Sequence, residues 1–209
     1  TLGFDGRVIS TGMGLNLENA LSEKRITFAY GEDLAGKLWQ DRPVLPAGKV
    51  YALSEEITGL KVEEKLGQVR EKMKNAGAEG FLLSKLDDIM WLFNIRGCDV
   101  ECNPVALSYA YITREESILF IQEKALDEGI IAYFVENNIT LKPYTEVVEY
   151  VKTLPGKCKV LADRRYCSYA LYKTLSEACE IIEAKNPTEI LKAVKNPTEL
   201  ANMEKIYLK

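Results

Sequence analysis

The sequence predicts an α/β fold in which helices lie on the faces of a mixed β-sheet. Between residues 62 and 184, apolar runs of strand length alternate with segments whose apolar residues recur at helical spacing. Glycine, proline and asparagine separate these segments. Hydrophobic residues make up 47% of the 209 residues, which is enough to bury a core.

The first 50 residues predict short elements that end in a proline linker. Glycines punctuate residues 1–14, a short surface helix is expected at 15–24, and residues 26–30 read as a strand. A helical turn at 34–39 then leads to a linker containing Pro43 and Pro46, whose rings cannot take part in regular ladders. We therefore place a domain boundary at the end of residues 1–50.

The middle of the chain predicts most of the sheet. Val62, Leu66, Val69 and Met73 share one face of a helix that Gly77 is suited to end. A buried strand is expected at 79–84, and a hairpin joins strands at 106–112 and 117–121. Further along the chain we expect helices at 123–136, 145–152 and 166–175, with strands at 139–141, 158–162 and 180–184.

A tyrosine spacing and a repeated five-residue sequence are both interpreted as structural features rather than functional ones. Tyr166, Tyr169 and Tyr172 fall at i, i+3 and i+6 of a predicted helix. This spacing predicts that their rings pack at the edge of the core while their hydroxyl groups remain in contact with water. Residues 186–190 and 196–200 repeat the sequence Asn-Pro-Thr-Glu followed by an aliphatic residue. Each copy predicts a helix start, with Asn as the cap and Pro in the first turn.

Composition excludes several classes of protein. The net charge is −4 and there is no basic tract, which argues against a nucleic-acid partner. No run approaches the ~18 apolar residues of a membrane helix, so we expect no membrane partner. The five cysteines lack metal-site spacing and indicate reduced thiols in the cytoplasm. Histidine is absent, which removes the imidazole that metal sites and general bases use most often.

Residues 87–104 bring aromatic and charged side chains unusually close together. Asp87 and Asp88 are expected to cap a short helix whose face of Ile89, Leu92 and Phe93 points inward. The helix is expected to break at Asn94, after which Arg96 precedes the flexible Gly97.

The order of residues 87–105, continuing into 108–113, resembles the long, three-domain Xaa-Pro aminopeptidases. Residues 3–5, 34–39 and the Asp-Arg-Pro-x-x-Pro linker resemble the end of that family's first domain, and residues 195–200 the start of its catalytic domain. The resemblance implies a creatinase/prolidase N-terminal domain at 51–185, preceded by a first-domain remnant at 1–50 and followed by a lead-in to the catalytic domain at 186–209.

The resemblance also implies a function. The parent protein is expected to be a cytosolic, homodimeric metallopeptidase that removes an N-terminal residue preceding proline, using a dinuclear, usually manganese, centre. Its metal ligands would lie beyond Lys209, so no catalytic or metal residue is assigned here and the fragment alone is expected to be inactive. The first residue is not Met and the last residues are helix-like, so we expect a piece of a longer protein whose work is subunit contact and shaping of the substrate entrance.

Arg96 is the one candidate substrate-binding residue, since a guanidinium can hold a peptide carbonyl or carboxylate by paired hydrogen bonds. An ion pair with Asp99 or Glu101 is the competing reading. A carboxylate metal site of Asp87, Asp88, Asp99 and Glu101 is disfavoured. Two other functions stay open: a metal-free aminopeptidase-like module that binds peptides or histones, and a free-standing α/β interaction domain.

Overall fold

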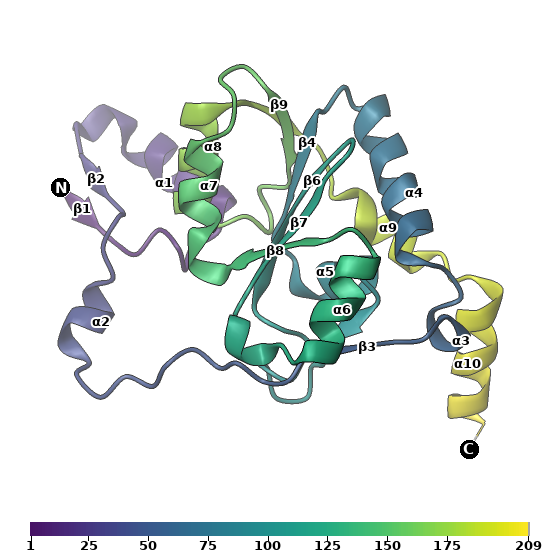
Figure 1. Cartoon of the computed structure of the whole chain (residues 1–209). Coiled ribbons are helices and arrows are strands. Elements are labelled where there is room, and N and C mark those ends of the chain that lie inside the picture. Colours follow the sequence, from purple (N-terminus) through teal and green to yellow (C-terminus); the bar gives the residue numbers. More distant parts are fainter. Residues whose placement is uncertain (209) are drawn as a thin grey trace.

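A six-stranded mixed sheet forms the centre of the protein in its computed structural model, which describes residues 1–208 (Figure 1). The strand order is β10-β9-β4-β6-β7-β8. All pairings are parallel except those of β6 with β4 and β7. The strands are β4 (Gly80–Leu83), β6 (Ser108–Thr113), β7 (Ser117–Ile121), β8 (Thr140–Pro143), β9 (Lys159–Ala162) and β10 (Glu180–Glu183). The predicted fold class is confirmed.

Side chains alternate between two cores because successive residues of a strand point to opposite faces. Phe81 and Leu83 of β4 join the core beneath α4, α5 and α6, whereas Leu82 joins the core beneath α7 and α8. These two helix groups lie on opposite sides of the sheet (Figure 1). The helices are α4 (Val62–Asn75), α5 (Leu86–Leu92), α6 (Glu128–Glu136), α7 (Val147–Lys152) and α8 (Tyr169–Ala178).

Several predicted boundaries are confirmed by backbone geometry. Gly77 follows α4 with φ +71°, a left-handed conformation that suits glycine. The hairpin of β6 and β7 closes with Thr113 N–H donating to Glu116 O at 2.9 Å.

Two sequence predictions are wrong in detail. The helix expected at 123–136 is a 3₁₀ turn (Glu123–Ala125) followed by α6, because the Asp127 side chain accepts the Ile130 N–H and starts a new helix. Tyr166 precedes α8, whose cap is Ser168, so the three tyrosines do not share one helix. Tyr169 itself is fully buried.

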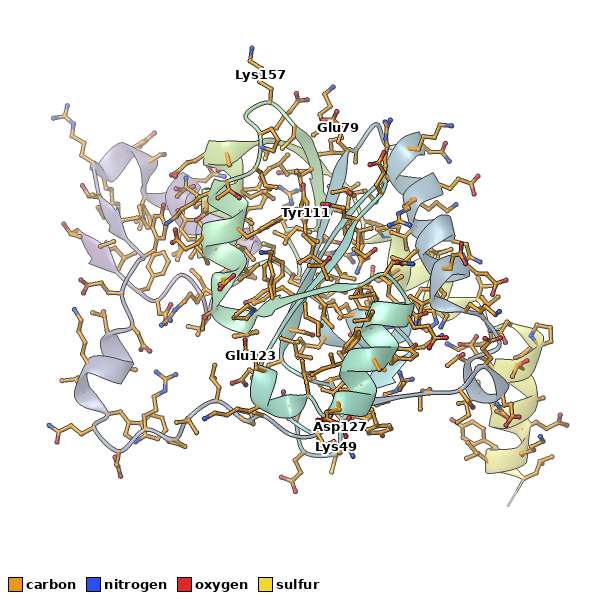
Figure 2. All side chains as sticks on the ribbon, viewed as in Figure 1. Lys49, Glu79, Tyr111, Glu123, Asp127 and Lys157 are labelled. Carbon is orange, nitrogen blue, oxygen red and sulfur yellow. The ribbon has the colours of Figure 1, made fainter. Side chains whose placement is uncertain are left out.

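The N-terminal residues form a separate small unit against α8. Strands β1 (Leu2–Gly3) and β2 (Phe28–Ala29) pair in parallel, and α1 (Thr11–Leu21) contacts α8. The chain then passes through α2 (Leu34–Leu38) and an extended stretch to β3 (Tyr51–Ala52). Lys49 pairs with Asp127 at 2.9 Å, which joins the end of this stretch to α6 (Figure 2).

Three further helices complete the fold, one before α4 and two at the C-terminal end of the described residues. They are α3 (Glu55–Thr58), which precedes α4, and α9 (Pro187–Ala193) and α10 (Pro197–Tyr207), which follow β10. Helix α9 contacts α4 and α5, and α10 contacts α3. Asn186 and Asn196 cap α9 and α10 as predicted, each accepting a backbone N–H with its side chain. Among residues 1–208 no helix combines the length and apolar character needed to cross a bilayer.

Candidate functional site

Helix α5 ends as the sequence predicts, with a reversal at Asn94. Asn94 has φ +52°, a conformation that asparagine tolerates better than most residues. Its side chain is fully used, because Nδ2 donates to Leu60 O at 2.8 Å and Oδ1 accepts from Lys65 Nζ at 2.6 Å. The reversal directs Ile95 and Arg96 into β5 (Ile95–Arg96), which pairs with β3.

Asp99 holds the loop after β5 rather than pairing with Arg96. One carboxylate oxygen accepts the Gly48 N–H at 2.6 Å and the other accepts the Leu107 N–H at 2.7 Å. The ion pairs of residues 1–208 include neither an Arg96–Asp99 nor an Arg96–Glu101 contact. The expected alternative for Arg96, an ion pair within its own loop, is therefore wrong.

Within residues 1–208, Arg96 donates to backbone carbonyls and forms no ion pair. Its Nη1 lies 2.7 Å from Ile95 O and 3.4 Å from Met90 O. Burial lowers the pKa of the guanidinium from its usual value, which records the cost of holding this charge away from water. Among the described residues Nε and Nη2 of Arg96 make no hydrogen bond, so these donors are unused.

Lys65 supplies a second cation beside Arg96. Its side chain on α4 is 1% exposed, and Nζ donates to Trp91 O at 3.0 Å as well as to Asn94. Nζ also lies 4.4 Å from the centre of the Trp91 ring, within range of a cation–π contact. Burial lowers the pKa of Lys65 to about 8. Lys65 was not among the residues predicted for the site, although its position between Val62 and Val69 puts it on the inward face of the helix.

Trp91, which contacts Lys65, has a hydrogen-bond donor that is not used. The side chain is 6% exposed, and its indole Nε1 has no hydrogen-bond partner among the described residues. A buried N–H without an acceptor is costly, and such groups are uncommon in folded proteins.

Lys65, Trp91 and Arg96 line one cavity of about 220 Å³. Helix α10 forms the facing wall through Glu199, Asn202, Met203 and Ile206, and the other lining residues are Leu53, Ile57, Thr58, Asn94 and Lys195. Glu199 is partly committed, because its carboxylate accepts the Asn196 N–H at 3.0 Å in the cap of α10. The cavity therefore offers cationic and N–H donors, which suit a carbonyl or carboxylate group.

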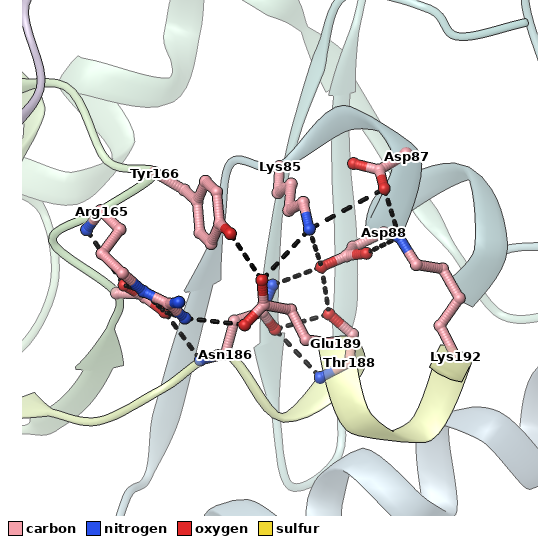
Figure 3. A network of polar contacts seen from close by, with 10 residues as sticks. Lys85, Asp87, Asp88, Arg165, Tyr166, Asn186, Thr188, Glu189 and Lys192 are labelled. Carbon is pink, nitrogen blue, oxygen red and sulfur yellow. Dashed lines mark hydrogen bonds and ion pairs between the residues drawn. The ribbon is translucent and has the colours of Figure 1, made fainter. Parts of the chain in front are cut away.

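A buried polar network joins the start of α5 to the start of α9, and it was not predicted from the sequence (Figure 3). Asp88 is not a helix cap, since Lys85 occupies the cap position of α5 and the Asp88 carboxylate is fully buried. It accepts from Asn186 Nδ2 at 2.6 Å and from Thr188 Oγ1 at 3.0 Å, and it pairs with Lys192. Asp88 thus binds α5 to the first Asn-Pro-Thr-Glu copy.

The same network continues on its exposed side to Glu189. This carboxylate accepts from Tyr166 Oη at 2.5 Å, from Arg165 Nη2 at 2.7 Å and from Lys85 Nζ at 3.2 Å (Figure 3). These hydrogen bonds lower the pKa of Glu189 to about 2, and the one from Tyr166 has the largest effect. Asp163 also joins, accepting the Asn186 N–H at 2.9 Å. Every one of these carboxylates has protein partners, as expected of a structural network.

Residues 1–208 contain no side-chain cluster suited to a transition-metal centre. Within residues 1–208 there is no group of three or more His, Cys, Asp or Glu side chains able to hold a metal ion. Asp99 is occupied by two backbone amides and Asp88 by its network. The donor set therefore does not fit a dinuclear centre, which needs several carboxylate or imidazole ligands.

The comparison with known proteins defines the family. A family model described as the Creatinase/Prolidase N-terminal domain matches residues 41–199. The chain belongs to this family. This creatinase/prolidase N-terminal domain is 32% identical over 217 residues to Xaa-Pro aminopeptidase 1 of Dictyostelium discoideum, and 34% identical over 229 residues to a probable Xaa-Pro aminopeptidase P of Tuber melanosporum.

The resemblance seen in the sequence is thus confirmed, since this domain matches the N-terminal portion of aminopeptidase P proteins. The two alignments cover 100% of the chain but 34% and 36% of the relatives, so the chain spans about a third of their length. A solved structure of X-prolyl aminopeptidase from Caenorhabditis elegans, described as a cytosolic enzyme with a di-nuclear active site, superposes with a TM-score of 0.86 at 29% identity. That match covers 97% of this chain and 34% of the nematode chain.

Proposed function

We propose that this domain is the non-catalytic N-terminal region of a cytosolic, homodimeric metallo-aminopeptidase that removes N-terminal residues preceding proline. Its role is subunit contact and shaping of the substrate entrance, and Arg96 binds substrate there. The three-part division at residues 1–50, 51–185 and 186–209 belongs to the same proposal. The cavity that Lys65, Trp91 and Arg96 help to line carries it, because donors that form no ion pair within residues 1–208 are gathered there beside the Glu199 carboxylate.

The relatives support the activity. Proteins named Xaa-Pro aminopeptidase match the whole chain, and the nematode neighbour is described as cytosolic with a di-nuclear active site. Because the residues of this domain do not fit such a centre, the metal, usually manganese in this family, would belong to the part of the protein outside this chain. The metal there would activate water for hydrolysis.

The part assigned to Arg96 follows from its geometry. Its backbone contacts to Met90 and Ile95 fix the guanidinium at the cavity without neutralising its charge. Ordering of a side chain before binding reduces the entropy lost when a ligand arrives. A peptide carbonyl or carboxylate that reached the cavity would accept from the free donors of Arg96, with Trp91 Nε1 as a second donor.

The test is the Arg96→Lys variant of the full-length enzyme. Lysine keeps the charge but loses the fork, so we expect KM to rise or kcat/KM to fall while Tm stays nearly unchanged. Arg70→Lys is a matched control, since Arg70 is also partly buried and also donates to backbone oxygens, at Thr113 and Glu116, but lies outside the cavity. An unchanged kcat/KM with a lowered Tm would assign Arg96 to structure.

The rival function, a metal-free module that binds peptides or histones, makes a different prediction for the full-length protein. Release of an N-terminal residue from an Xaa-Pro peptide that stops when a chelator is added supports the peptidase. Peptide binding without any chelator-sensitive cleavage would instead support the module.

A further inference from the structure

We propose that Cys158 and Cys179 form a reversible oxidative modification site, in which a peroxide converts the two thiols into an intramolecular disulfide. The proposal does not depend on the proposed function. Both cysteines are free thiols in the structure, and their Sγ atoms lie 2.6 Å apart. Their separation of 21 residues gives no local sequence signal of this pairing, so the pair could not be predicted from the sequence.

The strand register explains why the two thiols meet. Lys159 of β9 is the partner of Glu180 of β10, so Cys158 and Cys179 each stand one residue before a paired position. The Glu180 N–H donates to Cys158 O at 3.0 Å. This hydrogen bond extends the parallel pairing by one residue, to the position of Cys158 just before β9. Neighbouring strands lie about 4.8 Å apart. That spacing falls within the roughly 4.4–6.8 Å between Cα atoms that a disulfide spans.

The two thiols differ in how an oxidant reaches them. Cys179 is buried, and burial together with its contact to Cys158 raises its pKa to about 12. Cys158 is partly exposed and lines a surface cavity of about 560 Å³ with Tyr111, Tyr150 and Lys157. Lys157 lies at the tip of the loop before β9, at the end of the sheet where Glu79 also lies (Figure 2). Peroxide therefore meets Cys158 first.

The chemistry balances with peroxide as the oxidant. The Cys158 thiolate attacks one peroxide oxygen, the O–O bond breaks, and Cys158 becomes a sulfenic acid while the other oxygen leaves as water. The Cys179 sulfur then attacks the Cys158 sulfur, forming the S–S bond and breaking the S–O bond. The Cys179 proton leaves with the departing hydroxide as a second water. Two thiols are oxidised by two electrons and one peroxide is reduced.

The disulfide would close a loop containing β9 and α8. Helix α8 also bears the contacts with α1, so the modification fixes the part of the domain on which the N-terminal unit rests. Disulfides in reducing compartments are mostly transient and redox-sensing. The partly exposed Cys158 makes this pair accessible to reductant as well as oxidant.

The test is to treat the protein with hydrogen peroxide and map its peptides without reduction. We expect a cross-linked peptide pair joining Cys158 to Cys179, the loss of these two free thiols, and reversal by dithiothreitol. Tm should rise by roughly 6–12 °C on oxidation, from the entropy of a loop of this size.

Two variants separate this pair from the other thiols. Cys98 and Cys102 are both exposed and close in sequence, so Cys98→Ser with Cys102→Ser removes the competing pair and should leave the cross-link intact. Cys158→Ser should abolish both the cross-link and the rise in Tm. The unsubstituted protein decides the question even if a variant folds poorly. Peroxide-treated protein with Cys158 and Cys179 unlinked, or with Cys158 over-oxidised to the sulfonic acid, would overturn the proposal.

Discussion

Asp88 is the residue whose loss should most weaken the contact between α5 and α9. Its carboxylate is fully buried, accepts hydrogen bonds from Asn186 and Thr188, and forms an ion pair with Lys192. Truncation to alanine removes the acceptor of Asn186 Nδ2, while Thr188 Oγ1 keeps Asn186 Oδ1 and Lys192 keeps Asp87. Removing one partner of a buried ion pair costs about 3–5 kcal/mol, and we expect the lower end, ~3 kcal/mol, since Lys192 is 23% exposed and partly hydrated.

Two further variants test this magnitude. Asp88→Asn keeps the shape and one acceptor, so the expected cost is smaller, about 1–2 kcal/mol. Asp87→Ala is the matched control, because Asp87 is the adjacent residue and also pairs with Lys192 but is 47% exposed. An exposed ion pair contributes at most about 1 kcal/mol.

Urea unfolding at pH 7, extrapolated to water with a common m-value, measures all three variants. For a protein of this size, ~3 kcal/mol corresponds to a fall in Tm of roughly 6–12 °C for Asp88→Ala. If Asp88→Ala costs no more than Asp87→Ala, the network does not stabilise the fold and the reasoning from burial fails.

Three other predictions follow from the same structure. The purified chain should release no N-terminal residue from Xaa-Pro peptides with or without Mn²⁺, and chelator-sensitive release would contradict this. Limited proteolysis should cut first within 43–49 or the first ~30 residues, where the chain is extended or rests on few contacts, and a first cut inside 60–180 would refute the domain boundary. Finally, the pKa of Lys65 is about 8 in the folded chain against 10.5 in the unfolded chain, so between these values the unfolded state binds more protons at this residue and the Lys65 contribution to stability should rise with pH, by up to ~1.4 kcal/mol per unit. Burial raises the pKa values of Cys167 and Tyr169, whose contributions run the other way, so the comparison is between the slopes of the unsubstituted protein and the variant. Lys65→Met should lack this rise in urea unfolding curves, and an equal slope in both proteins would refute the assignment.

The sheet and its helices could be predicted because each depends on a local period. The apolar face of α4 and the buried run of β4 are written in consecutive residues, and the structure places them where the pattern predicts. The break at Asn94 was equally local. The errors at residues 123–136 and at Tyr166 arose where a capping side chain, Asp127 or Ser168, starts a helix later than the apolar pattern suggests.

The site was less predictable, since its parts come from distant segments. Asp88 was expected to cap α5, because the groups that bury it lie about a hundred residues away, in and beside α9. Arg96 was the candidate that the sequence offered, and the structure places it at the cavity, whereas Asp99, its alternative carboxylate partner, binds backbone amides. Whether a carboxylate caps a helix, fixes a loop or joins a buried network depends on tertiary contacts that local patterns do not contain.

The two Asn-Pro-Thr-Glu copies show how one local signal serves two tertiary purposes. In the first, Asn186 caps α9 and also donates to Asp88, so the cap anchors the helix beneath α5. In the second, Asn196 caps α10 and donates to Thr58 O at 2.8 Å.

The second contact depends on Gly59. This residue has φ +68°, and a Cβ there would lie 2.3 Å from Asn196 Oδ1. A side chain at position 59 would therefore push the start of α10 away from α3. Because Glu199 and Asn202 of α10 form the wall opposite Arg96, the width of the cavity is set by an asparagine cap and a glycine rather than by the residues that line it.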